Sequence, residues 1–272
     1  MPMTMTTGSV VRTIAVIGLV GSITAAPAAG QLAERVRGAE DGTVRFDYPA
    51  HPDVEVCENG VRWGENNMRW QWDDDRKERE CVRGRAEVAM SLRAGTVRDV
   101  RVVRPGAELS SRFDRPVLDL GSVGAEEASD FLLGLAFDGA TTDGAEEAIL
   151  PAMLADAGDR WPELLEIARD DAIHQGVRTN ALFWVGQAAA DTVTGELADV
   201  ATDDEEEQEI RNAAIFALSQ RDDDESVPAL MEIARTGAES ETRKTAMFWL
   251  AQSEDPRVVR FFEDVLLGRS RQ

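Results

Sequence analysis

The sequence is poor in histidine, tyrosine and positive charge. Its 272 residues include two His and one Tyr, which excludes sites that need several imidazole groups. Lys and Arg together number 29 against 51 for Asp and Glu, so the formal net charge is −22. That balance excludes the broad basic face with which proteins hold nucleic acid or anionic lipid. We therefore predict no nucleic-acid partner.

Catalytic motifs are also lacking. The chain contains no GxSxG, HExxH or CxxC motif and no glycine-rich phosphate loop. His51 lies in a Pro-flanked loop and His174 lies between two predicted helices, with no third group at triad spacing. Carboxylates are abundant, so a catalytic pair of acids on one face remains open. We predict no catalytic residue, no metal site and no cofactor, and hence no enzyme.

Residues 1–30 have the pattern of a secretory signal peptide. Arg12 precedes a short apolar stretch from Ile14 to Val20, and small residues follow, with possible cleavage after Ala28 or Gly30. The apolar stretch is shorter than the ~20 residues of a spanning helix, although a retained anchor is the alternative. We expect an exported protein, periplasmic or secreted, with no stable membrane span after cleavage.

Negative charge is concentrated in the second half of the chain. Residues 121–272 hold 33 acidic against 12 basic side chains, a net −21, whereas residues 31–120 sum to −2. This change in composition predicts a boundary near 115–128. We expect a small β-module over 38–108, a linker over 109–127 and a helical domain over 128–268.

The predicted β-module contains both cysteines. Apolar residues alternate with polar ones over 44–48 and over 82–92, and after a turn at Ala94-Gly95 a further strand is expected over 97–103. Cys57 and Cys81 form an even pair in a chain expected outside the cytosol, which predicts a disulfide. A bridge closing a loop of about 25 residues stabilises such a module by roughly 3–4 kcal/mol.

Three tryptophans lie between the cysteines, namely Trp63, Trp70 and Trp72. Trp70 and Trp72 share a face if that segment is a strand. Two interpretations stay open at this point. The three side chains form the core of a small disulfide-linked module, or they are exposed as a platform for a sugar ring or another small ligand.

The second half of the chain repeats itself. The segments 178–187, 211–220 and 243–252 align without gaps and share Arg, Ala, Phe and Gln at the same four positions. Each follows a second recurring segment, at 162–170, 195–203 and 228–236. Both segments have the apolar spacing of an amphipathic helix, so each repeat is predicted to be a helix pair. A degenerate first pair at 130–157 and a closing helix at 256–267 give about four pairs plus one helix.

The repeat resembles a known family. The pattern Val177-Arg178-x-x-Ala181-x-x-Trp184-Val185-Gly186, after a first helix of the PxLxxIA kind, is similar to HEAT repeats of the short, phycobilisome-lyase-like type. The resemblance implies an all-α solenoid whose second helices line a concave surface, and it implies protein partners or, in some relatives, bilin chromophores. The acidic partner usual for the repeat Arg is irregular here, because Thr236 stands where Asp171 and Asp204 precede the other two.

The recurring Phe is the main candidate for function. It takes a position that the short HEAT pattern usually leaves variable and exposed, and in each repeat it shares a helical stripe with two other residues. The candidate residues for partner binding are Asn180, Phe183, Gln187, Phe216, Gln220, Phe248 and Gln252. Exposed, they suit an extended peptide or a partner's helix. The alternative is that the Phe side chains pack between successive helices. Trp184 and Trp249 are expected in the core.

The sequence therefore predicts an exported, non-catalytic scaffold that binds a protein or peptide on a HEAT-like α-solenoid preceded by a small disulfide-linked β-module. The alternative function is an envelope protein that binds a carbohydrate or small ligand through Trp63, Trp70 and Trp72.

Overall fold

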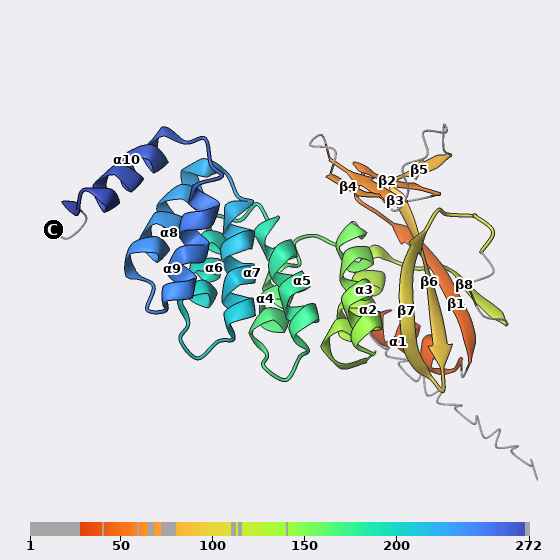
Figure 1. Ribbon diagram of the computed structural model, residues 1–272. Helices are drawn as coiled ribbons and strands as arrows, with labels where there is room; N and C mark the ends of the chain where they lie inside the picture. Colours follow the sequence, from red (N-terminus) through yellow and green to blue (C-terminus); the bar gives the residue numbers. More distant parts are fainter. Residues whose placement is uncertain are drawn as a thin grey trace, which may run out of the picture.

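The computed structural model describes residues 28–39, 41–58, 60–64, 68–71, 80–109, 113, 116–139 and 141–269 (Figure 1). Most of the predicted signal peptide lies outside these residues. Its last three residues begin helix α1, Ala28–Arg37. Among the described residues, no helix combines the length and apolar character needed to cross a membrane.

The first half of the chain contains a four-stranded sheet in the order β7-β6-β1-β8. Its strands are β1 Gly42–Pro49, β6 Arg85–Arg93, β7 Thr96–Val103 and β8 Val117–Ser122. β6 pairs antiparallel with β1 and β7, while β8 runs parallel to β1. Val44, Phe46 and Tyr48 all point into the core, as their alternation with polar residues predicts. The turn at Ala94-Gly95 joins β6 to β7, as expected.

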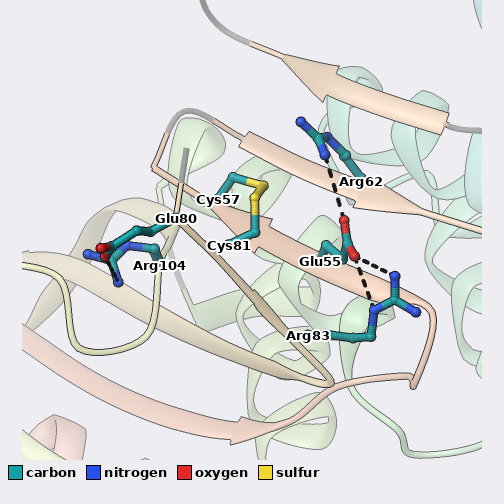
Figure 2. Close-up of a disulfide and its surroundings, with 7 residues drawn as sticks. All are labelled: Glu55, Cys57, Arg62, Glu80, Cys81, Arg83 and Arg104. Carbon is teal, nitrogen blue, oxygen red and sulfur yellow. Dashed lines mark hydrogen bonds and ion pairs between the residues drawn. A yellow bond between two sulfur atoms is a disulfide. The ribbon is translucent and has the colours of Figure 1, made fainter. Parts of the chain in front are cut away.

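A second, smaller sheet has the order β4-β3-β2-β5. Its strands are β2 Val54–Cys57, β3 Gly60–Trp63, β4 Met68–Gln71 and β5 Cys81–Arg83. Cys57 and Cys81 stand opposite each other on β2 and β5, with their Cα atoms 4.1 Å apart, and are joined by a disulfide (Figure 2). The β character and the disulfide predicted for this region are confirmed.

One predicted strand is wrong. The sequence predicts a single strand over 82–92, but β5 and β6 belong to different sheets. Gly84 separates them with a φ of 69°, a conformation that side-chain-bearing residues rarely adopt. Its N–H donates to the Val54 carbonyl at 3.0 Å and its carbonyl accepts from the Ala50 N–H at 3.0 Å, so Gly84 links the two sheets.

Helices α1, α2 and α3 pack with the larger sheet. α2 is Ala125–Gly134 and α3 is Thr142–Leu154, joined by the π-helical turn Leu135–Gly139. The buried Tyr48 hydroxyl donates to the carbonyl of Pro151 on α3 at 2.7 Å, and burial raises the pKa of this phenol. Glu147 accepts a hydrogen bond from the N–H of Val100 on β7 at 2.9 Å, and burial raises its pKa. These contacts join the sheet to the helices that follow.

The segment expected as a linker, 109–127, contains strand β8 and the start of α2. β8 is paired with β1 and therefore belongs to the sheet. A linker was expected because this segment separates two kinds of composition. The sequence signal for a strand is weak in this segment because β8 buries little of its surface. Leu118, for example, is 43% exposed. The division of the chain into domains stays a prediction.

The second half consists of helix pairs followed by one further helix. The pairs are α4 Trp161–Arg169 with α5 Gln175–Gly186, α6 Thr192–Thr202 with α7 Gln208–Ser219, and α8 Asp223–Thr236 with α9 Ser240–Leu250. The second helices α5, α7 and α9 pack side by side, and α3 packs against α5. The pairs extend away from the sheet, and α10, Pro256–Leu266, lies at the far end (Figure 1). The predicted helical repeats are confirmed.

The repeated Arg explains part of this architecture. Arg178 donates through Nε to the Ala168 carbonyl at 2.8 Å, and Arg243 donates through Nη1 to the Gly237 carbonyl at 2.6 Å. Arg211 donates in the same way to the Asp203 carbonyl at 3.1 Å. Each Arg thus satisfies carbonyls at the end of the first helix of its own pair, which have no partner within the helix. Backbone carbonyls thus accept hydrogen bonds from all three Arg, and Arg178 also forms an ion pair with Glu206.

Close packing between α5 and α7 depends on Gly186. A Cβ atom at this position would lie 2.9 Å from the carbonyl oxygen and 3.0 Å from the Cβ of Ala217. Gly195 on α6 offers a control, because a Cβ there would meet nothing within 4 Å. We predict that Gly186→Ala lowers the free energy of unfolding by about 1–3 kcal/mol through overpacking. Gly195→Ala should raise it by about 0.5–1 kcal/mol through helix propensity. Urea unfolding shows whether each substitution lowers or raises the free energy of unfolding. A Gly186→Ala variant that is more stable than the parent chain would contradict the close packing of α5 and α7.

Candidate functional site

Aromatic side chains form a continuous row across the second helices. The Phe183 and Phe216 rings stack with their centroids 6.4 Å apart, and Phe216 lies 5.0 Å from Trp249. Phe248 lies 5.2 Å from Trp249, and Trp184 lies 5.4 Å from Phe183. We call these five residues the aromatic row. It runs from α5 through α7 to α9, so each second helix supplies at least one ring.

The rings of the row differ in exposure. Trp184 is 3% exposed and belongs to the core, as expected. Phe183, Phe216 and Trp249 are half-buried, and Phe183 and Trp249 pack against the core. Phe248 is 57% exposed. Trp249 was expected in the core, yet it contacts the rings of both Phe216 and Phe248.

The row continues into the smaller sheet through Trp63. The Trp63 ring lies 5.8 Å from Trp184 and stacks on His51 at 5.2 Å. Trp63 thus packs against the helical repeats. The Trp70 side chain and all of Trp72 lie outside the described residues, so the structure does not place the three tryptophans together.

The polar candidates of the repeats have different roles. The Asn180 side-chain amide donates to the Glu146 carbonyl on α3 at 2.9 Å, which ties α5 to α3. The Thr245 hydroxyl, at the equivalent position on α9, donates to Oδ1 of Asn212 on α7 at 3.0 Å. On α5 and α9 this position therefore connects to a neighbouring helix, whereas α7 has Ala213 there. Asn180 is a structural contact in addition to being a candidate for binding.

The repeated Gln side chains lie at the carboxyl ends of the second helices. Gln220 and Gln252 are exposed and Gln187 is half-buried. The Gln220 amide donates to the hydroxyl of Ser219 at 3.2 Å. Across the described part of the repeats, the Gln187 and Gln252 side chains make no hydrogen bond. Two of the three amides are therefore available to a partner's backbone.

Charge is distributed unevenly over the second helices. After the first turn of α5, α7 and α9, the charged residues are the three Arg of the repeat column and Lys244. Acidic side chains gather at the amino-terminal ends of α7 and α9, where the helix dipole favours them. The exposed members of this acidic edge are Glu207, Glu209, Glu239 and Glu241. The aromatic row thus lies on a largely uncharged strip between an acidic edge and a line of Gln amides.

The first helices present a different surface. Glu166, Asp199 and Glu232 occupy equivalent positions on α4, α6 and α8, and all three are exposed. Their repetition makes this layer acidic along its length. The uncharged strip is therefore particular to α5, α7 and α9.

The two histidines have structural contacts. His51 stacks on Trp63, and its Nδ1 lies 3.6 Å from a carboxylate oxygen of Asp156. His174 caps α5 by accepting a hydrogen bond from the Gly176 N–H at 3.2 Å. Within the described ranges, no three His, Cys, Asp or Glu side chains are grouped so as to hold a metal ion.

Residues 161–251 match the family model of HEAT repeats. The match begins at the first residue of α4 and ends next to the last residue of α9, so it covers three helix pairs. No curated protein and no solved structure matches the chain. The three helix pairs that supply the aromatic row are therefore the part of the chain that is similar to HEAT repeats.

Proposed function

We propose that the chain is an exported, non-catalytic interaction scaffold whose HEAT repeats form a solenoid and bind a polypeptide across α5, α7 and α9. The observation that carries this proposal is the aromatic row on an uncharged strip. HEAT repeats commonly mediate protein–protein interaction, which supports a protein partner.

The chemistry of the strip is that of a binding surface. Interface cores are depleted of charged residues and enriched in aromatic ones, whereas most protein surface carries interspersed charge. Rings that are half-buried against their own core are held in place before binding, so a partner loses little side-chain entropy by contacting them. Phe248, the most exposed ring, extends this surface to α9.

Export is supported by the disulfide and by the pattern of residues 1–30. Disulfides persist in oxidising compartments and are rare in the cytosol. The Cys57–Cys81 bridge joins neighbouring strands of the smaller sheet, which contacts the repeats through Trp63. A periplasmic or secreted scaffold would keep this bridge oxidised.

Phe248→Ala tests the proposed surface. Because Phe248 is exposed, we expect the free energy of unfolding to change by less than about 0.5 kcal/mol. Binding of peptides selected from a random library against the full chain should weaken at least about tenfold, the cost of losing an aromatic anchor. Fluorescence anisotropy with a labelled selected peptide measures the dissociation constant.

The matched control is Leu266→Ala on α10, another exposed apolar residue, which is 85% exposed. This variant should bind selected peptides as the parent chain does. Phe216→Ala should weaken binding too, with a stability loss below the ~3–5 kcal/mol of a fully buried ring. Selected peptides that bind Phe248→Ala and Phe216→Ala unchanged would show that the aromatic row is not the binding surface.

A further inference from the structure

The helical stack ends on α10 with an apolar residue at a position that earlier helices bury. Leu165 on α4 and Met231 on α8 each follow the Pro of their helix by three residues, and they are 7% and 9% exposed. Val259 takes this position on α10, at the far end of the stack, and is 62% exposed (Figure 1). Val259 therefore has the residue type of a buried position without its burial.

The second helices show the same change. Leu182 on α5 and Ile215 on α7 are fully buried, whereas Met247 takes the equivalent position on α9 and is half-buried. A terminal repeat that faces water needs a polar outer face. Because α9 and α10 keep apolar residues at positions that the inner pairs bury, this end of the stack has the character of an interface.

The outer side of α10 carries two adjacent stripes. The inner side packs into the stack through Val258 and Phe261, and the guanidinium carbon of Arg235 lies 4.9 Å from the centroid of the Phe261 ring. Each outer stripe has i, i+3, i+7 spacing, so its members share one side of the helix. The apolar stripe is Val259, Phe262 and Leu266, and the mixed stripe beside it is Arg260, Glu263 and Leu267. Phe262 is half-buried, and the other five side chains are exposed.

Charge distinguishes this end from the rest of the helical region. Residues 121–239 hold 28 acidic against 6 basic side chains, a net −22, whereas residues 240–269 hold five of each. Surfaces of like charge repel each other, so two copies of this chain associate most readily where their charge is balanced. The balanced segment includes α10 with its apolar stripe.

The mixed stripe is also complementary to itself. Arg260 precedes Glu263 by about one turn, and within the described part of the chain neither side chain forms a hydrogen bond or ion pair. A two-fold axis across the helix places a second α10 antiparallel to the first. Arg260 of each copy then faces Glu263 of the other, while the two apolar stripes face each other. Self-complementarity of this kind favours a second copy over an unrelated partner.

We propose that the chain forms a symmetric homodimer in which two copies of α10 pack antiparallel at the ends of their helical stacks. Val259, Phe262 and Leu266 form the centre of the contact, and the two pairs of Arg260 with Glu263 flank it. The contact uses no residue of the aromatic row, so it does not depend on the proposed peptide binding.

Two charge reversals test the contact by sedimentation equilibrium of the full chain at physiological salt. The parent chain should reach twice the mass of one copy at micromolar concentrations. Arg260→Glu places two carboxylates opposite each other in each pair, and Glu263→Arg places two guanidinium groups there. Each variant alone should raise the dissociation constant of the dimer at least about tenfold, because like charges then meet twice.

Mixing the two variants restores the complementary charges. The carboxylates at positions 260 and 263 of one variant face the guanidinium groups of the other, so the equimolar mixture should again reach twice the single-copy mass. This recovery also shows that both variants are folded. The matched control is Glu166→Arg on α4, an exposed charge reversal outside the contact. It should change the dissociation constant less than about twofold.

Leu266→Ala separates dimerisation from peptide binding. It removes apolar area from both sides of the two-fold axis, so the dissociation constant of the dimer should rise at least about tenfold. The affinity for library-selected peptides should stay that of the parent chain, whereas Phe248→Ala should change only the peptide affinity.

Three results would overturn the dimer. A parent chain that keeps the mass of one copy throughout the concentration range would leave a different protein as the partner of α10. Single charge reversals that dimerise as the parent chain does, or an equal loss in Glu166→Arg, would place the contact elsewhere. Masses that grow beyond two copies would exclude the two-fold arrangement, because head-to-tail contacts do not close at two.

Discussion

Replacing Arg221 with methionine is expected to lower the free energy of unfolding by about 2–3 kcal/mol, because the substitution leaves several part-buried acceptors without a donor. The Arg221 side chain is 5% exposed and lies where α5, α6 and α8 meet. Its guanidinium donates to the Ala188 carbonyl at 2.7 Å and to the Thr194 hydroxyl at 2.8 Å. The further acceptors are the carbonyls of Gly186 and Ala190 and the carboxylate of Glu225.

These contacts connect one repeat to the next. The carbonyls belong to the end of α5 and the segment that leads to α6, whereas Arg221 itself precedes α8. Repeat stacks are stabilised mainly by interfaces between neighbouring repeats. The loss of the Arg221 contacts should therefore destabilise both repeats that they join. Methionine retains much of the apolar stem and removes the donors.

Equilibrium urea unfolding followed by far-UV circular dichroism measures the effect. The control is Arg169→Met, which removes an exposed Arg whose Nη2 lies 2.8 Å from Glu196 on α6. That pair also joins two repeats, but at the surface, so its loss should cost less than about 1 kcal/mol. Similar losses for the two variants would refute the central role of Arg221.

Acid should reduce the difference between the parent chain and Arg221→Met. Hydrogen bonds from Thr194 and Arg221 lower the pKa of Glu225 below its ordinary value. A carboxyl with a lowered folded-state pKa adds stability above its unfolded-state pKa and loses it as pH falls through the folded-state value. Arg221→Met removes one cause of the shift. Unfolding at neutral and at acidic pH should therefore show a smaller gap between the two proteins in acid.

The helix pairs were predictable because their sequence signal is local. The apolar spacing of α5, α7 and α9 recurs in three aligned decapeptides, and each helix buries the face that this spacing defines. The capping role of Arg178 was not predictable in the same way. An Arg that recurs at the same position in three repeats indicates a shared role, but its acceptors are backbone carbonyls, which any sequence supplies.

Contacts between distant segments could not be derived from patterns. Trp63 and Trp184 are 121 positions apart, and no periodicity relates a strand of the smaller sheet to a helix of the repeats. Arg221 stands outside the repeated columns, with Ala188 at the equivalent position one repeat earlier, so its role had no sequence signal. Apolar and polar residues alternate on both sides of Gly84, so the pattern does not indicate that the chain passes from one sheet to the other at this residue.

Removing the disulfide with Cys57→Ala and Cys81→Ala is expected to lower the stability of the smaller sheet by about 3 kcal/mol, since the bridge closes a loop of sequence separation 24. β5 has only three residues, and among the described strands it pairs with β2 alone. Without the bridge, β5 is held by its short ladder, by Gly84 and by the ion pair of Arg83 with Glu55 (Figure 2). These contacts are exposed or few, so they do not replace the covalent bond.

The effect should be confined to one part of the molecule. Loss of the small sheet releases Trp63 from Trp184, so tryptophan fluorescence should change at lower urea than the helical circular dichroism signal. In the parent chain, the two signals should change closer together. Adding reductant to the parent chain should reproduce the behaviour of the double variant.

Glu55→Gln is the matched control within the same sheet. It removes the ion pairs of Glu55 with Arg83 and with Arg62, the latter at 3.7 Å, and leaves the disulfide in place (Figure 2). Because both Arg partners of Glu55 are exposed, the cost should stay below about 1 kcal/mol. A double cysteine variant no less stable than Glu55→Gln would mean that the ladder between β2 and β5 holds the sheet unaided. We expect the double cysteine variant to lose more stability than Glu55→Gln. That result would show that the disulfide stabilises this sheet and holds Trp63 in place at the end of the aromatic row.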